Sequence, residues 1–403
     1  MGEKKGKKEF LARLIRGGEL YTPDYRGKGD VLIVGSIVAK IAPQIPIPKD
    51  FLEVEIVEAA DKIITPGFID QHVHMIGAGG TAGPVSRTRE IRIQQITQAG
   101  VTTAVGSLGL DDITRDMKRL LVKAKGLEEQ GITTFVYTGS YAVPSITLTG
   151  SIETDFLLID KVVGVKLGLG EPLSTYPMDQ DIKRLLSGAR RGGLLSGKAG
   201  IVHIHMGECP GKLFESVAGI LQATTIPMSQ VVFTHCNRSS VVFQSALEFA
   251  KKGGMLDMTG VQNPDLLPPM VAQERLARGL RKPSKAIEEM LAAGIGQNQM
   301  TMSSDSNAGG KTPDGGWRYG SIMSLYVGFK DLAQSTRNIS LALQMVTLNP
   351  ATRLGILSSK GTLDEGKDAD LLVMTRDLQI EAVYARGKIM VKEGEATVKD
   401  PYE

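Results

Sequence analysis

The middle of the chain alternates strand-like runs with helix-like runs, and this alternation constrains the fold more than any other feature. Between about residues 63 and 357, eight short runs are rich in Val, Ile and Thr, as buried parallel strands are. The runs are Ile63–Met75, Val101–Ser107, Thr133–Tyr137, Val162–Leu169, Ile201–Met206, Val231–Cys236, Met255–Thr259 and Met300–Ser304. Eight β-α units in succession predict an α/β fold, a closed (β/α)8 TIM barrel rather than an open sheet.

The segments between these runs carry helical periodicity. One apolar stripe begins at Asp111 and Asp112 and stops near Gly131. Its members are Ile113, Met117, Leu120, Leu121, Ala124 and Leu127.

The two flanks differ from the middle, with short strands broken by Pro and Gly. Neither flank is large enough to fold alone, so we expect both termini to build one small β-sandwich domain. The predicted division is 1–62 for its N-terminal part, 63–357 for the catalytic barrel and 358–403 for its C-terminal part.

Composition excludes several classes of protein. A net charge of +3 over 403 residues indicates neither nucleic acid nor an acidic membrane as a partner. No apolar run approaches the ~18 residues that span a bilayer, and the basic start is interpreted as a frayed tail, not a signal peptide. With only two cysteines, Cys209 and Cys236, a disulfide framework is absent and a cytoplasmic location is expected.

Unusual residues gather where the predicted strands end. Barrel enzymes build their sites at the carboxyl ends of the strands, so these side chains can converge. Imidazole and carboxylate are common ligands of zinc. The candidate metal ligands are His72 and His74 on strand 1, Lys166 on strand 4, His205 on strand 5, His235 on strand 6 and Asp305 on strand 8.

Lys166 lies in an apolar run, Val162–Leu169, where a charged ammonium is costly. Either its pKa falls and leaves a neutral amine, or CO₂ carboxylates that amine to an anion that two cations stabilise. Four imidazoles, a carbamate and Asp305 suit two divalent ions better than one.

Such a centre predicts hydrolysis of an amide. Metals lower the pKa of water from 15.7 to roughly 7, which supplies a nucleophile near neutral pH. Asp305 is the expected proton carrier to the leaving nitrogen, and Tyr141, just beyond strand 3, the expected donor to the developing oxyanion.

Other residues have simpler interpretations. His203 is expected to point away from the site as a core or structural histidine. Buried cysteine is usually small apolar filler, so Cys209 and Cys236 are not expected to be ligands. The loop Gly77–Gly80 lacks the Lys-Ser/Thr of a phosphate loop and is interpreted as backbone that approaches substrate.

With these residues in view, the chain resembles the amidohydrolase superfamily, and within it the isoaspartyl dipeptidase family. The resemblance covers nearly the whole chain. The matching segments are Pro66–His74, Tyr137–Tyr141, Gly164–Lys166, His205–Gly207, Thr234–Arg238, Ser303–Asp305 and Gly366–Val373.

The resemblance implies two zinc ions, one held by His72, His74 and Asp305 and the other by His205 and His235. Lys166 would bridge them as N6-carboxylysine. Tyr141 would polarise the scissile carbonyl, and Arg238 would pair with a substrate carboxylate. A homo-oligomer is also implied. The family cleaves β-aspartyl dipeptides.

Departures from the family fall in the substrate pocket, where Gly79, Thr81, Leu110, Leu173 and Gly309 are the candidate contacts. Thr81 stands where the family has a Glu that holds the α-amino group, and Leu173 where it has a second carboxylate-binding Arg. Leu110 replaces a Thr, and Gly309 replaces a Ser. Loop 260–282, with three prolines, is longer than expected. Losing one partner of a buried charge pair costs ~2–5 kcal/mol in binding, enough to change substrate preference.

Three hypotheses remain. The first is hydrolysis of an isoaspartyl dipeptide or close relative. The second is hydrolysis of a less charged amide on the same machinery: an N-acyl amino acid, a cyclic amide or a lactam. The third is a scaffold that lost activity, which the complete ligand set disfavours. Zinc is the first choice of metal, with manganese or cobalt as alternatives.

Overall fold

The computed structural model describes residues 11–47, 53–171 and 174–402. The basic start of the chain and Leu173 therefore lie outside the described residues. Within them, no helix has the length and apolar character needed to cross a membrane.

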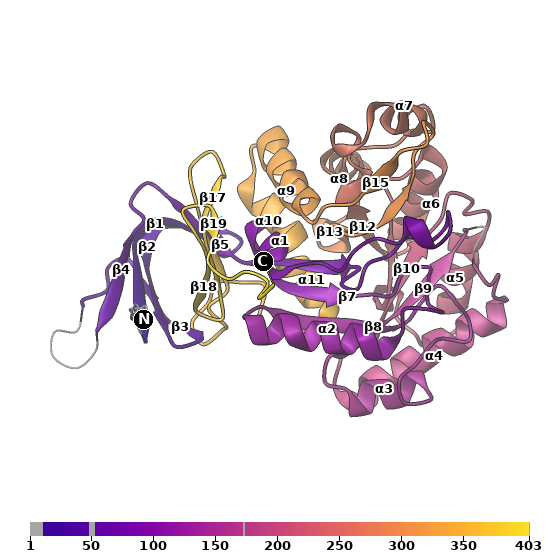
Figure 1. Ribbon diagram of the computed structural model, residues 1–403, viewed down its shortest axis with the longest axis horizontal. Helices are drawn as coiled ribbons and strands as arrows, with labels where there is room; N and C mark the ends of the chain where they lie inside the picture. The colour runs from indigo at the N-terminus through magenta and orange to yellow at the C-terminus, as the bar shows by residue number, and fades with distance from the viewer. Residues whose placement is uncertain (1–10, 48–52, 172–173, 403) are drawn as a thin grey trace.

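The eight runs predicted as parallel strands form one sheet that curves into a barrel, with helices packed around it (Figure 1). Its strands follow chain order: β6 (Phe68–Val73), β7 (Val101–Gly106), β8 (Thr133–Gly139), β9 (Val162–Leu169), β10 (Ile201–Met206), β11 (Val231–Thr234), β12 (Met255–Thr259) and β13 (Met300–Ser303). A parallel bridge between Val73 and Ser306 links the first strand to the segment after the last. The predicted (β/α)8 fold is confirmed.

Helices cover the outer face of the barrel because one side of each is apolar. They are α1 (Ile93–Gln98), α2 (Met117–Gln130), α3 (Ile152–Leu158), α4 (Asp179–Ser196), α5 (Leu213–Gln222), α6 (Ser240–Lys251), α7 (Pro269–Ala277), α8 (Pro283–Ala292), α9 (Met323–Thr336), α10 (Ile339–Val346) and α11 (Leu348–Leu354).

The stripe predicted from Asp111 onward begins later than expected. Asp116 caps α2 by accepting a hydrogen bond of 2.9 Å from the backbone N–H of Arg119. Ile113 precedes this cap and is 91% exposed, so it is not part of the apolar face. A capping carboxylate starts the helix wherever it can reach the free N–H groups of the first turn, and Asp116 does so.

A second, mostly antiparallel sheet is shared by the two ends of the chain, on the left in Figure 1. Its strands are β1 (Ala12–Tyr21), β2 (Tyr25–Val34), β3 (Ile37–Ala42), β4 (Val54–Glu58), β5 (Ile63–Pro66), β16 (Leu371–Met374), β17 (Ile380–Ala385), β18 (Lys388–Lys392) and β19 (Glu395–Ala396). A small hairpin, β14 (Gly309–Lys311) and β15 (Trp317–Tyr319), follows the barrel.

The segment expected as the first barrel strand, Ile63–Met75, divides at Gly67. β5 pairs with β16 and β1 in the terminal sheet, and β6 alone enters the barrel. A side chain at Gly67 would lie 2.3 Å from Thr102 Oγ1, so only glycine fits where the chain passes from one sheet to the other. The predicted bounds of the two domains stay a prediction.

Candidate metal centre

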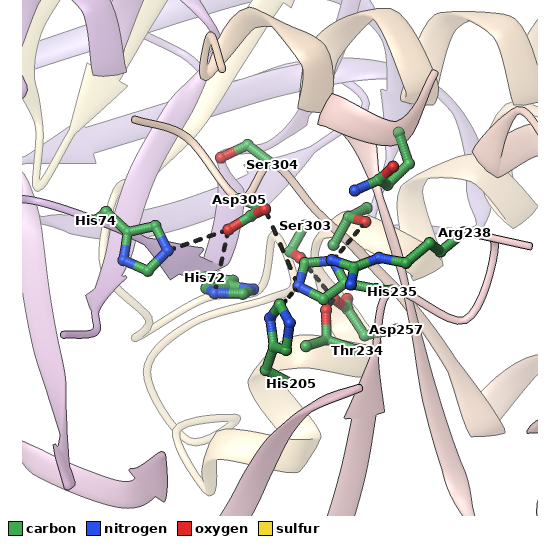
Figure 2. Close-up of polar contacts among 12 residues, drawn as sticks. His72, His74, His205, Thr234, His235, Arg238, Asp257, Ser303, Ser304 and Asp305 are labelled. Atoms are coloured by element: carbon green, nitrogen blue, oxygen red, sulfur yellow. Dashed lines mark hydrogen bonds and ion pairs between the residues drawn. The ribbon is translucent and has the colours of Figure 1, made fainter. Parts of the chain in front are cut away.

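The six predicted ligands lie together at the carboxyl ends of the barrel strands, and Figure 2 shows five of them: His72, His74, His205, His235 and Asp305. All six are buried. His72, Lys166 and His205 lie within β6, β9 and β10. The other three ligands directly follow strands: His74 follows β6, His235 follows β11 and Asp305 follows β13. Because these strands pair in one parallel sheet, the six residues lie at the same end of the barrel.

His72, His74 and Asp305 form the first group. Oδ1 of Asp305 lies 3.3 Å from Nε2 of His72 and 3.2 Å from Nε2 of His74. The backbone supports this contact, since Asp305 N–H donates to the His72 carbonyl at 3.0 Å. Donor atoms ~2.0–2.1 Å from a tetrahedral zinc lie about 3.3 Å apart, so these spacings fit one ion.

His205 and His235 form the second group. Nε2 of His235 lies 2.8 Å from Nδ1 of His205 and 4.0 Å from Oδ2 of Asp305. Asp305 thus stands between the two groups, with one carboxylate oxygen toward each (Figure 2). The hydroxyl of Tyr141 lies 2.6 Å from Nδ1 of His205, inside the same cluster.

Lys166 is fully buried, and its Nζ lies 2.8 Å from Nε2 of His72. Burial lowers the pKa of Lys166 to about 7, although the negative charges of Asp305 and Asp257 raise it. A substantial share of the amine is therefore neutral near pH 7, and the neutral amine is the form that can take up CO₂.

Two of the histidines are oriented by contacts of the ring nitrogen that faces away from the centre. Nδ1 of His74 contacts the carbonyl of Ser107 at 3.2 Å, and Nδ1 of His235 contacts Oγ1 of Thr259 at 2.9 Å. Each contact leaves Nε2 directed into the centre, as metal-binding histidines require.

Two of these residues also have unusual backbones. His235 and Asp305 have φ angles of 65° and 55°, which non-glycine residues seldom adopt. Such strain is concentrated at functional sites, because the surrounding structure must hold it in place.

The protonation states of the histidines suit a bound metal ion. Burial lowers the pKa of His72 and His235 well below the usual range, and burial lowers the pKa of His205 to about 4 despite its contact with Glu171. Neutral imidazole is the form that binds metal. Ligand atoms of His72, His235 and Asp305 all lie within 4.8 Å of one another.

A pocket of about 160 Å³ opens on this centre and contains the predicted substrate contacts Gly79, Thr81, Leu110, Arg238 and Gly309 in its lining. Leu173, the remaining one, is outside the described residues. Gly79 has a φ of +77°, and a side chain there would lie 2.4 Å from the Ser86 carbonyl oxygen. The loop can therefore approach the pocket only with glycine at this position.

Three charged or amide side chains of the pocket were not predicted from the sequence: Glu171, Gln262 and Arg318. Glu171 lies two residues beyond β9, so its place after a strand could have indicated it. Its carboxylate is 2.7 Å from Nη1 of Arg238 and 3.0 Å from Nε2 of His205. Gln262 comes from the long loop 260–282, which includes α7.

The prediction that His203 points away from the site is wrong. Its ring lies 4.8 Å from that of His72 and is stacked on Tyr137 at 5.2 Å, inside the barrel. Residues two apart in a strand share a face, so His203 and His205 point to the same side of β10.

Comparison with known proteins identifies the family. Residues 63–390 match the amidohydrolase family. The chain belongs to the amidohydrolase family. A solved β-aspartyl dipeptidase from Fervidobacterium islandicum AW-1, in complex with β-Asp-Leu, is 34% identical, with a TM-score of 0.85 over 96% of this chain and 98% of that one. The predicted resemblance to isoaspartyl dipeptidases is confirmed.

More distant relatives vary in activity. Imidazolonepropionase from Brucella abortus (strain S19) is 24% identical over 384 residues, covering 86% of each chain. Dihydropyrimidinase from Brevibacillus agri NCHU1002 shares the fold at 16% identity, with a TM-score of 0.67 over 96% of each chain. As an amidohydrolase closely similar to dipeptidases, the protein is a hydrolase of amide or peptide bonds.

Proposed function

We propose that this amidohydrolase carries two divalent metal ions and cleaves an isoaspartyl dipeptide or a close structural relative. The convergence of His72, His74, His205, His235, Lys166 and Asp305 supports this proposal most directly. The solved relative that binds β-Asp-Leu supports the substrate class.

The donor set suits zinc. His72, His74 and Asp305 would hold one ion and His205 and His235 the other, with carboxylated Lys166 shared between them. When bound, such ions polarise a carbonyl and lower the pKa of water. Neutral imidazoles and a buried amine with a pKa of about 7 meet the protonation requirements of these ligands.

The chain's own residues supply the proton transfers. Asp305 accepts a proton from the attacking water and delivers it to the leaving nitrogen. Tyr141 is buried beside His205, and burial raises the pKa of its hydroxyl well above the usual range, so the hydroxyl keeps its proton and donates to the carbonyl oxygen.

Arg238 pairs with a carboxylate of the substrate. In the structure its guanidinium contacts Glu171 at 2.7 Å and its Nε has no hydrogen-bond partner among the described residues. Because Arg238 lines the pocket, a substrate carboxylate would pair with the part of the guanidinium that Glu171 does not engage.

A second candidate is an N-acyl amino acid, a cyclic amide or a lactam. Thr81, in the pocket wall, carries no charge to hold an ammonium group, and Leu110 adds an apolar surface nearby. The pocket therefore also suits a substrate without a free amino group. A small-molecule substrate and a homo-oligomer are part of both proposals.

The test is a substrate panel on zinc-loaded protein: β-Asp-Leu, N-acetyl-leucine and dihydrouracil, with zinc content measured alongside. We expect turnover of β-Asp-Leu or N-acetyl-leucine and about two zinc ions per chain. His235→Ala should lose both zinc and activity. A Gln244→Ala control changes an exposed residue of α6 and should lose neither. Zinc-replete protein inactive on the whole panel would contradict the proposal.

A further inference from the structure

The β14–β15 hairpin carries a second arginine into the pocket wall. Arg318 stands opposite Gly310 in the hairpin register, and its side chain folds back over that glycine. The residue lines the pocket together with Arg238, Gly309 and Asp305.

The guanidinium of Arg318 is half-buried and makes no hydrogen bond or ion pair with any residue within 11–47, 53–171 or 174–402. Burial lowers the pKa of Arg318, the charge of Asp305 raises it, that of Arg238 lowers it, and that of Glu208, which is itself paired with Arg278, raises it. A partly desolvated cation beside another cation is unfavourable, and a ligand carboxylate would offset that cost.

Arg275 adds to the positive charge. Burial, followed by the charges of Arg318 and Arg238, lowers the pKa of Arg275 to about 10. Its Nη1 donates to Gln262, which itself lines the pocket. Two arginines thus line the pocket, and a third lies behind Gln262 in its wall.

The carboxylates of the pocket are already engaged. Glu171 contacts Arg238 and His205, and Asp305 contacts His72 and His74. Among the described pocket residues no other side chain carries negative charge, and Thr81 is neutral. An ammonium group on the substrate would therefore enter a pocket with unpaired positive charge and no free carboxylate.

We propose that the substrate is an N-acyl amino acid whose acyl group ends in a second carboxylate, the half-amide of a short dicarboxylic acid. Arg238 holds the carboxylate of the amino acid, and Arg318 holds that of the acyl group. This inference rests on the proposed amide hydrolysis. N-succinyl-leucine illustrates the class, since it is β-Asp-Leu without the amino group.

The reaction balances as a simple hydrolysis. One water is consumed and the amide C–N bond breaks. The acyl carbon gains the oxygen of the water and the nitrogen gains a proton. N-succinyl-leucine yields succinate and leucine.

The experiment compares N-succinyl-L-leucine with N-butyryl-L-leucine, in which a methyl group replaces the terminal carboxylate, and with β-Asp-Leu, on zinc-loaded enzyme. We expect kcat/KM for the succinyl substrate to exceed both others by at least about 10-fold. Arg318→Gln should lower that value by about 10- to 100-fold, the usual effect of losing a hydrogen bond to a charged group. Its effect on the butyryl substrate should be at least about 10-fold smaller.

Lys311→Gln is the matched control, because Lys311 is an exposed cation of the same hairpin that does not line the pocket. It should leave the three kcat/KM values within about two-fold. Equal losses on both acyl substrates in Arg318→Gln, or fastest turnover of β-Asp-Leu, would overturn the inference.

Calorimetry separates this inference from the proposed hydrolysis. Succinate and butyrate are titrated into zinc-loaded protein and into Arg318→Gln. If no amide is cleaved, the proposed function fails. The assignment of Arg318 to the acyl carboxylate is then still supported if succinate binds more tightly than butyrate and Arg318→Gln removes that difference. Equal binding of the two acids would refute it.

Discussion

The amine of Lys166 and the imidazole of His72 face each other across the barrel, with Nζ 2.8 Å from Nε2. Lys166 comes from β9 and His72 from β6, 94 residues earlier in the chain. The contact brings a fully buried amine against a proposed metal ligand, and it supports the proposal that Lys166 is carboxylated when metal is bound.

Lys166→Ala should abolish activity and reduce bound zinc. Metal assistance contributes several kcal/mol to catalysis, so kcat should fall by at least about 10³-fold. Acetate or another short-chain acid, with CO₂ present, should restore part of it. Zinc content and kcat are measured together, with Lys252→Ala, an exposed residue, as control. Full activity in Lys166→Ala would rule out the carbamate.

Tyr141→Phe should lower kcat by about 10²- to 10³-fold without changing zinc content, because the hydroxyl stabilises the developing oxyanion and is not a metal ligand. Tyr326→Phe is the control, since that hydroxyl donates to the Leu378 carbonyl at 2.8 Å, remote from the pocket. A Tyr141→Phe enzyme with unaltered kcat would remove the tyrosine from the chemistry.

Thr81→Glu should raise kcat/KM for β-Asp-Leu by about 10-fold, because a new carboxylate in the pocket wall can hold the α-amino group. Thr81→Gln tests side-chain size without charge and should give no such gain. If Glu and Gln act alike, the ammonium group does not bind at this wall.

Lys360→Ala should lower the free energy of unfolding by about 3–5 kcal/mol, since it leaves buried carboxylate uncompensated. Lys360 is 3% exposed and lies 2.6 Å from Asp370, at the entry to β16, and 2.6 Å from Thr133 of β8. It thereby connects the terminal sheet with the barrel. Lys251→Ala, which removes the exposed pair with Glu248, should cost less than about 1 kcal/mol in the same denaturant titration.

One of the two cysteines should react with a thiol reagent in the native protein. Cys209 is exposed, whereas Cys236 is buried and its thiol donates to the Phe233 carbonyl at 3.1 Å. Burial also raises the pKa of the Cys236 thiol far above neutral pH. Native protein should consume one equivalent of reagent and unfolded protein two; rapid modification of Cys236 in the native state would disprove its burial.

Much of the barrel could be predicted from local patterns. Buried parallel strands need continuous β-branched or apolar runs, and β9 and β10 have them. β1 was not anticipated, since Arg13, Arg16 and two adjacent glycines interrupt its apolar residues. Its partners, β2, β4 and β5, supply the stabilisation that its own sequence lacks.

The sequence by itself determined the kind of chemistry, because histidine, lysine and aspartate at strand ends must meet at one rim once the strands run parallel. Only the tertiary structure decided the charge of the pocket. Glu171 comes from the loop after β9 and Arg318 from the β14–β15 hairpin that follows β13. The path of such connections depends on long-range packing, not on any periodicity in the chain.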